Sequence, residues 1–334
     1  SRHLRHQCAT HMATSPCAAG LGSVNTLRSN IVRKLDVSSI EVVSCHAVAA
    51  DEGLLALGPN TEEVLIFQLE GSEFRLQQTL SKHTQRVTGL AWSPPVRGQR
   101  PRLASCSEDR TAYVWEFDES LGSWVAFIVE LASPRAALCV AWAPNGQRFA
   151  VGLASKDTAV CYWMEAVESW IAVKVGRSKA SVVSVSWHPN SEFLATGSTD
   201  GRCCVYNVNE ESMLPDPLPP FGELQCMEDS GAWVNTVMFS TSGRYLAYLT
   251  QDSSVSIKDL SEGPQAQSSK VRWKGLPFLT GAWLNDRCFV ACGFDFVPVL
   301  FQRSNGKWEC RGSVDTRAAP ASPMARAGAG AGAG

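Results

Sequence analysis

One sequence motif recurs along this chain and constrains its fold more than any other feature. It consists of a short apolar run, an aromatic residue and a polar turn, and its aromatic positions are separated by 50, 45, 52 and 44 residues. A weaker copy places Val48 44 residues before the first of them. Regular spacing of this kind indicates a repeated structural unit, each copy of which buries its apolar face against the next. The recurring positions are Trp92, Trp142, Trp187, Phe239 and Trp283.

Each copy continues into further strand-like segments joined by tight turns. The apolar residues alternate or run together over four to six positions and do not follow a helical period, so strands are expected. The Asn305-Gly306 pair fits a two-residue type I′ hairpin, because both residues tolerate positive φ. An aspartate occupies the turn after the second strand, and we expect five equivalent blade-turn residues: Asp109, Asp157, Asp200, Asp252 and Asp295.

These features predict an all-β WD40 β-propeller. The period agrees with the roughly 40–45 residues and four strands of one WD blade. Six blades are detectable between residues 40 and 315.

The domain limits follow from composition. We expect the propeller at residues 37–315, a disordered N-terminal extension at 1–36 and a low-complexity Ala/Gly/Pro tail at 316–334. Residues 1–36 carry five cationic residues before their first acid, Asp36, which is also the composition of an organelle transit peptide. Met12 as the true start is a further alternative.

The segment 207–232 is predicted to be a loop inserted between the fourth and fifth blades. It contains four prolines and six acids but no Lys or Arg, and prolines disfavour the ladder of a sheet. Long loops on rigid scaffolds commonly carry contacts. Phe221, Glu223 and Leu224 are therefore the candidate partner-contact residues; a solvated linker is the alternative.

The second blade holds four polar and aromatic residues in an arrangement that stiffens WD blades. We expect a structural tetrad in which His83, Ser105, Asp109 and Trp115 form one hydrogen-bonded chain. A catalytic triad of His83, Asp109 and Ser105 is the alternative. The structural interpretation is favoured because the same sequence positions recur as structural turn residues in every blade.

Composition excludes several classes of function. With 45% hydrophobic residues, 19% charged residues and a net charge of -2, the chain has no polyanion-binding character, so no nucleic-acid partner is expected. The 12 cysteines form no C-x-x-C pair, which favours reduced, buried thiols in a reducing compartment and no metal site. No stretch approaches the roughly 18–20 apolar residues of a membrane span.

Catalytic and cofactor motifs are also missing from the sequence. There is no H-E-x-x-H, no G-x-S-x-G and no phosphate-binding glycine run, so neither a cofactor nor an enzymatic activity is expected. A propeller enzyme would need polar or metal-binding residues that converge on the central channel.

Several longer strings resemble one family. PFGEL at 220–224, GAWVNTVMFS at 231–240, EDRTAYVW at 108–115 and FDFVPVLF at 294–301 are similar to the WD-repeat subunit, subunit 1, of the actin-related protein 2/3 complex. The resemblance extends from about residue 40 to residue 314. It implies a non-catalytic scaffold in the cytoplasm, at the actin cytoskeleton. Implied partners are the actin-related proteins, the other subunits, the actin filament and nucleation-promoting factors.

The chain departs from that family in one respect. The family has seven blades, whereas the strand pattern here stops at Val314. We expect a chain truncated before the last blade, with a divergent six-bladed closure as the alternative. For function, the alternative is a WD40 adaptor in another assembly, such as a ubiquitin ligase or a chromatin complex, which would not need the PFGEL string.

Overall fold

The structure is a computed structural model that describes residues 40–71, 73–95, 100–210, 220–263 and 265–314. The expected extension at 1–36 and the expected tail at 316–334 lie outside the described residues. No helix in the described part is long and apolar enough to cross a membrane.

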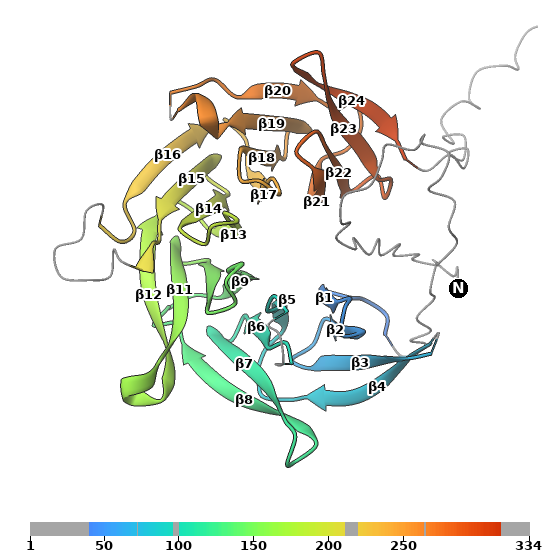
Figure 1. The fold of residues 1–334 in the computed structure, drawn as a ribbon, viewed down its shortest axis with the longest axis vertical. Helices are drawn as coiled ribbons and strands as arrows, with labels where there is room; N and C mark the ends of the chain where they lie inside the picture. Colours follow the sequence, from blue (N-terminus) through green and yellow to red (C-terminus); the bar gives the residue numbers. More distant parts are fainter. Residues whose placement is uncertain (1–39, 72, 96–99, 211–219, 264, 315–334) are drawn as a thin grey trace, which may run out of the picture.

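The described residues form six four-stranded antiparallel sheets, and within each sheet the strands follow one another in chain order. Figure 1 shows the sheets arranged around a centre as the blades of a propeller, which confirms the predicted fold class. The short 3-10 helices η2 (Glu165–Val167) and η4 (Leu260–Glu262) lie in connections between strands.

The bounds of the strands define the blades. Blade 1 contains β1 (Cys45–Ala49), β2 (Leu54–Gly58), β3 (Val64–Glu70) and β4 (Glu73–Leu80). Blade 2 contains β5 (Val87–Trp92), β6 (Leu103–Ser107), β7 (Thr111–Asp118) and β8 (Ser123–Glu130). Blade 3 contains β9 (Ala137–Trp142), β10 (Arg148–Leu153), β11 (Asp157–Met164) and β12 (Ser169–Arg177). Blade 4 contains β13 (Val182–Trp187), β14 (Phe193–Ser198), β15 (Arg202–Asn207) and β16 (Leu224–Asp229). Blade 5 contains β17 (Val234–Phe239), β18 (Tyr245–Thr250), β19 (Ser254–Asp259) and β20 (Ser269–Arg272). Blade 6 contains β21 (Phe278–Asn285), β22 (Cys288–Gly293), β23 (Val299–Ser304) and β24 (Lys307–Ser313).

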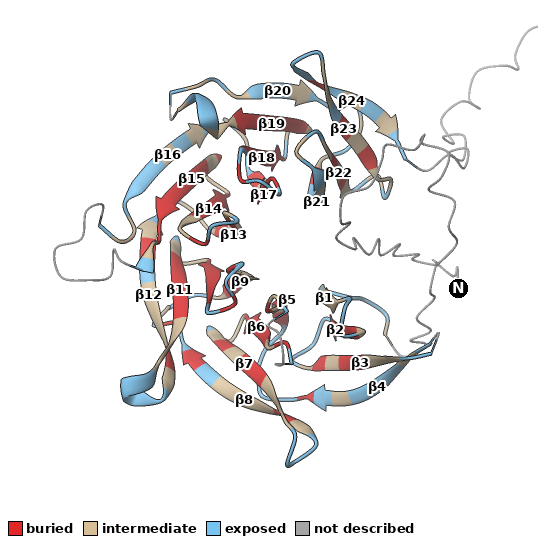
Figure 2. Ribbon diagram, in the orientation of Figure 1, coloured by how far each residue is buried: buried red, intermediate tan, exposed pale blue. Residues whose placement is uncertain are grey.

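Burial follows the position of a strand within its blade. The second strands are covered on both faces by neighbouring blades, and every residue of β2, β6 and β10 is buried. The outermost strands have one face in solvent, and β16 alternates between exposed and half-buried residues over most of its length. Figure 2 shows this gradient from the middle of each blade to its rim. This explains why the second strands contain mainly apolar and small residues, whereas the outer strands alternate with polar ones.

Successive blades meet through their innermost strands. Strand β5 packs against β1 and β9, β13 packs against β9 and β17, and β17 packs against β21. Among the described residues, the blade of β21–β24 and the blade of β1–β4 share no comparable contact, and Figure 1 shows these two blades lying apart. The described ring is therefore joined at five junctions.

The recurring tryptophans make the joint between blades. The indole Nε1–H of Trp142 donates to the carbonyl of Ala91, at 2.9 Å, on the innermost strand of the preceding blade. The acceptor is in each case the residue before the preceding anchor position, so one bond is repeated around the ring. The other pairs are Trp92 to Ala47 at 3.1 Å, Trp187 to Ala141 at 3.0 Å and Trp283 to Met238 at 3.2 Å.

Hydroxyl groups on the same strands donate in the opposite direction, to the following blade. Thr88 Oγ1 donates to the carbonyl of Ala137 at 2.8 Å, and Thr236 Oγ1 donates to that of Leu279 at 2.7 Å. Each such pair satisfies a backbone carbonyl that the antiparallel ladder leaves free at the edge of the innermost strand.

The junction between blades 4 and 5 uses other donors, because Phe239 stands where the other blades have tryptophan. Phenylalanine has no donor, and here the backbone N–H of Phe239 donates to Ser186 Oγ at 3.2 Å. The N–H of Val237 donates to Ser184 Oγ at 3.1 Å. As at the other junctions, the later blade donates to the earlier one. Here the donors are backbone N–H groups and the acceptors are serine hydroxyls.

Residues 224–229 correct the expected inserted loop of 207–232. They form β16, the outermost strand of blade 4, which pairs with β15 from Arg202–Asp229 to Tyr206–Leu224. The prolines are confined to 215–220, so they leave the following alternating segment free to enter the ladder. Any insertion therefore lies between β15 and β16 of one blade and not in the connection to the next.

The last hairpin has the turn that its sequence predicts. Asn305 and Gly306 join β23 to β24 with φ values of 50° and 80°. Both central residues have positive φ, as a type I′ turn requires.

The inter-blade indole bond can be tested with two buried tryptophans of blade 3. Trp142→Phe removes the donor to Ala91, and we expect a loss of about 1–2 kcal/mol in the free energy of unfolding. Trp170 is the matched control: it is 3% exposed, and its Nε1 has no hydrogen-bond partner among the described residues. Trp170→Phe deletes a similar volume without a bond, so urea denaturation should give the smaller loss. Equal losses would show that the indole bond contributes nothing.

Candidate functional site

One face of the ring, which we call the turn face, is built from the connections between blades and from the turns between second and third strands. A backbone bond holds the two together in blades 2 to 6, whereas Pro59 follows the second strand of blade 1 and has no N–H to donate. The residue that follows the second strand donates its N–H to the carbonyl that precedes the first strand. The pairs are Glu108 to Arg86, Ala154 to Ala136, Thr199 to Ser181, Gln251 to Trp233 and Phe294 to Pro277.

The four tetrad residues meet on the turn face of blade 2. His83 Nδ1 lies 2.9 Å from Asp109 Oδ2, and His83 Nε2 lies 2.8 Å from Ser105 Oγ. The indole of Trp115 donates to the same Ser105 Oγ at 2.9 Å. The side chains of His83 and Asp109 are 1% and 6% exposed, so the chain of hydrogen bonds is almost closed to solvent.

Asp109 is the charged end of this network. Burial opposes its ionisation, but hydrogen bonds from His83, Thr111 and the N–H of Thr84 outweigh that effect and hold the pKa of Asp109 well below its usual range. Thr111 Oγ1 donates to Oδ1 at 2.6 Å, and Thr84 N–H donates to Oδ2 at 2.9 Å. The carboxylate therefore ties the turn to the connection that enters the blade.

The other blade-turn aspartates divide into two groups. Asp200 and Asp295 repeat the bond from the turn to the connection: they accept the N–H of Lys179 and of Leu276, both at 2.7 Å. Asp252 accepts the N–H of Ser254 at 3.2 Å and so closes its own turn.

Asp157 does not hold the equivalent position that its sequence suggested. The pairs Cys106–Ala112 and Gly152–Thr158 flank the two turns, so Ser155 corresponds to Asp109. Asp157 is the first residue of β11, where its carboxylate accepts a bond from Ser155 Oγ at 3.3 Å and lies 3.7 Å from Lys174 Nζ. The expectation was wrong by two residues because Ser155 supplies a hydroxyl where blades 2, 4, 5 and 6 supply a carboxylate.

The same registers reveal a feature that sequence reasoning missed. The residue after the aspartate position has positive φ in every blade from 2 to 5: Arg110 (74°), Lys156 (80°), Gly201 (85°) and Ser253 (60°). In blades 2 and 3 this residue is cationic and exposed.

Arg110 and Lys156 belong to a row of exposed cations along the turn face of blades 2 to 4, which we call the cationic rim. None of its members forms an ion pair with any described residue. Neighbouring Arg86 is paired with Glu108 and is not counted. A search for Lys and Arg beside the turn positions would have found the row. Its members are Lys82, Arg110, Arg135, Lys156 and Lys179.

The predicted partner-contact residues lie at the start of β16 and differ in exposure. Phe221 is half-buried and packs against the core of blades 3 and 4. Glu223 is exposed, and Leu224 is 48% exposed on the outer strand. The structure brings them together at the turn that contains Gly222 (φ 83°), and their contact role stays a prediction.

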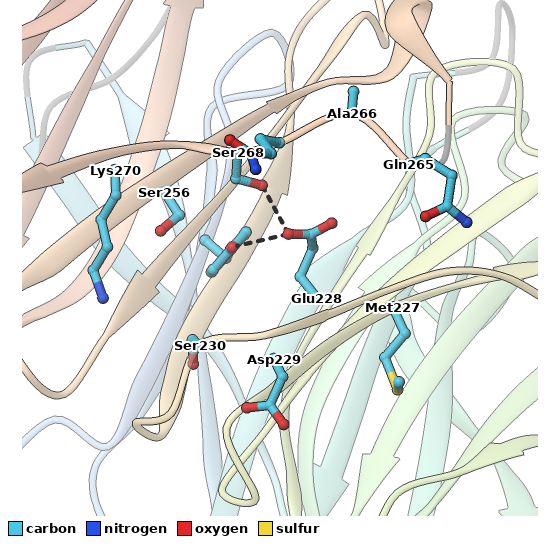
Figure 3. Close-up of a pocket in the computed structure, with 11 residues that line it drawn as sticks. Met227, Glu228, Asp229, Ser230, Ser256, Gln265, Ala266, Ser268 and Lys270 are labelled. Atoms are coloured by element: carbon cyan, nitrogen blue, oxygen red, sulfur yellow. Dashed lines mark hydrogen bonds between the residues drawn. The ribbon is translucent and has the colours of Figure 1, made fainter.

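A recess of about 400 Å³ lies between β16 and the segment leading into β20 (Figure 3). Its floor holds Glu228, which accepts hydrogen bonds from Lys258 Nζ at 2.6 Å and from Ser268 Oγ at 3.0 Å. Lys258 is fully buried and also donates to the carbonyl of Ala266 at 2.8 Å. Because these bonds engage both oxygens of the carboxylate, the group joins blade 4 to blade 5 and does not offer a free acid or base.

Metal-binding and thiol chemistry find no site in the part of the chain that the structure describes. No group of three or more His, Cys, Asp and Glu residues there is placed to hold a metal ion. The described cysteines are free thiols, and burial raises the pKa of Cys139 to about 12. A thiol of that kind packs as a small apolar side chain.

Comparison with known proteins finds a WD domain, G-beta repeat, at residues 74–116, 131–164 and 171–207. Actin-related protein 2/3 complex subunit 1A-A of Xenopus laevis is 33% identical over 273 residues, which cover 78% of this chain and 72% of the relative. Subunit 1A of Arabidopsis thaliana is 34% identical over 280 residues, covering 80% and 72%. Subunit 1 of Schizosaccharomyces pombe is 33% identical over 258 residues, covering 74% and 67%.

The charge of Asp109 predicts a pH dependence of stability. Its pKa is lowered by folding, so its contribution is complete above the unfolded value of about 3.9 and is lost as pH falls toward the folded value. At pH 7 we expect Asp109→Asn to lower the free energy of unfolding by about 2 kcal/mol.

Urea denaturation of the two proteins between pH 7 and pH 3 checks this prediction. The difference between wild type and variant should stay constant down to about pH 4 and shrink below it. A difference that does not change across the range would contradict the role given to the carboxylate.

Proposed function

Because this chain belongs to the subunit 1 family of the actin-related protein 2/3 complex, we propose that it acts as the propeller scaffold of that complex and contributes to nucleation of branched actin filaments. The observation that carries the proposal is the identity of 33% and 34% to relatives so named, over 78% and 80% of this chain. Its place of action is then the cytoplasm, at the actin cytoskeleton.

The scaffold in this proposal is non-catalytic, and the geometry of the tetrad supports that. Ser105 is 0% exposed, and its hydroxyl already meets both His83 and Trp115. A nucleophile must reach its substrate, and this hydroxyl lies beneath the turn that Asp109 closes. The network therefore has the partners of a structural lock and not the access of an active site.

The proposed partners are the actin-related proteins, the other subunits, the actin filament and nucleation-promoting factors. A rigid ring that presents backbone turns at fixed spacing is suited to hold several proteins in a set arrangement.

We place the activator on the cationic rim. Five exposed cations without an ion pair to a described residue favour an acidic segment of a nucleation-promoting factor, because such charges steer an oppositely charged partner. Two of them occupy a backbone position that glycine adopts more readily. Arg110 and Lys156 have φ values of 74° and 80°, where blade 4 has Gly201. A non-glycine side chain at this position costs about 1 kcal/mol.

Affinity capture tests the scaffold role. The full chain, expressed in cells and captured under native conditions, should return both actin-related proteins in equal amounts with it. A capture that contains the chain but neither actin-related protein would contradict the assignment. Reproducible hydrolase or redox activity that purifies with the chain would contradict its non-catalytic part.

A pair of glycine variants tests the activator site. Arg110→Gly and Lys156→Gly together remove two charges and relieve the left-handed backbone, so stability should stay within about 1 kcal/mol of wild type. Affinity of the assembled complex for an acidic nucleation-promoting factor should fall about three- to tenfold, with a weaker dependence on salt.

Ser253→Gly is the matched control, because Ser253 has the same turn position in blade 5 (φ 60°) and no charge. It should leave affinity and salt dependence unchanged. If the double variant binds as wild type does, the activator is not received on the rim.

A further inference from the structure

Three large apolar side chains are exposed together on the turn face of blades 5 and 6. Trp233 is 58% exposed, Leu276 is 53% exposed and Phe294 is 42% exposed. We call these three residues the apolar patch. An indole exposed to this degree leaves much of its large apolar surface in water.

The fold does not require these residues at these positions. The backbone bond that recurs on the turn face identifies the equivalents of each one in the other blades, and most of those are polar or small. Trp233 corresponds to Arg86, Ala136, Ser181 and Pro277; Leu276 corresponds to Gln85, Arg135, Ala180 and Ala232; Phe294 corresponds to Glu108, Ala154, Thr199 and Gln251. Large apolar side chains are thus concentrated where the remaining blades do without them.

The three positions are connected through short contacts. Phe294 N–H donates to the carbonyl of Pro277 at 3.1 Å, which places it beside Leu276. Asn235, two residues after Trp233, donates to the carbonyl of Phe278 at 3.0 Å and so reaches from blade 5 to blade 6. The patch therefore spans one blade junction on one face.

One of the charges beside the patch is engaged within the fold. Asp295 follows Phe294, but its carboxylate accepts the indole N–H of Trp273 at 3.1 Å and the N–H of Leu276 at 2.7 Å. The cationic rim lies over blades 2 to 4, whereas the patch lies over blades 5 and 6. The two areas of the turn face consequently differ in chemistry: the rim consists of cations, whereas the patch consists of apolar side chains, with exposed Lys274 two residues before Leu276.

We infer that the apolar patch is a permanent docking site for an uncharged, apolar face of a neighbouring subunit, with Trp233 as its anchor. The inference rests on the proposed function, since it takes that subunit from the same complex. The apolar character of the three residues favours this occupant, because the centres of stable interfaces are depleted in charge and enriched in tryptophan. An acidic or basic segment would find no opposite charge on the three residues.

A photo-cross-linking amino acid introduced at position 233 of the full chain, in the assembled complex, tests the contact directly. We expect a cross-link to one subunit. The control position is 121, because Leu121 is 68% exposed in the turn between β7 and β8, away from the turn face. A cross-linker at 121 should give no such product. Absence of a subunit cross-link from position 233 in a complex of full composition would overturn the inference.

Trp233→Ser, with Leu121→Ser as its control, measures the strength of the contact. Because the indole is more than half exposed, thermal unfolding of the chain should be little changed. Dissociation of the chain from the purified complex should become about 10- to 100-fold more favourable for Trp233→Ser and stay the same for Leu121→Ser.

The outcomes separate this inference from the proposed function. If the unsubstituted chain enters the complex and Trp233→Ser dissociates as wild type does, the patch is not the docking site, although the scaffold role stands. If the unsubstituted chain does not enter the complex at all, the proposed function fails and this inference fails with it.

Discussion

The hydrogen bond from a tryptophan of one blade to a backbone carbonyl of the blade before it is the interaction on which the ring depends. A four-stranded sheet of this size has two apolar faces and cannot bury either one alone. Burial supplies the attraction between blades but no alignment, because apolar contact is non-directional. The indole N–H adds direction: Trp142 reaches Ala91 and Trp187 reaches Ala141, always at the residue before the preceding anchor. The spacing of the repeat along the chain therefore reflects the need to place one anchor residue in each blade for this bond.

The turn face follows from the same construction. Once the innermost strands are aligned, the connection into the blade and the turn after its second strand meet and share one backbone bond in blades 2 to 6. Asp109 with its histidine, and Asp200 with a backbone N–H, lock this meeting point from inside. The side chains that point outward at the same turns do not take part in these bonds. Exposed cations gather beside these turns in blades 2 to 4, and exposed large apolar side chains gather beside them in blades 5 and 6, so one scaffold presents two kinds of surface.

Sequence reasoning succeeded where periodicity and composition act together. The strand pattern, the anchor residues and the Asn305-Gly306 turn depend on local rules that a single chain reveals. Sequence reasoning failed where equivalent positions of two blades hold different residue types. Asp157 was matched by residue type, whereas the ladder matches Ser155 to Asp109. The strand at Leu224–Asp229 was hidden behind prolines, because a proline-rich segment suppresses the signal of a short strand beside it.

The left-handed backbone of the cationic rim and the exposure of the apolar patch were hidden for a different reason. Arg110 and Lys156 are ordinary surface residues in sequence, and only their φ values show that a glycine-favouring position carries a charge. Trp233 reads as one more aromatic residue beside a strand, and its exposure becomes visible only when the neighbouring blades are in place. Properties that depend on tertiary neighbours cannot be read from one repeat.

The central claim is that the turn face of a ring joined blade to blade is the side that meets partners in the actin-related protein 2/3 complex. A cryo-electron microscopy map of the complex assembled with this chain tests it most directly. The account predicts that Trp233 and its neighbours on blades 5 and 6 are covered by another subunit, with the turns of Arg110 and Lys156 facing the activator. A map in which the turn face lies in solvent, while the opposite face of the ring makes the contacts, would contradict it.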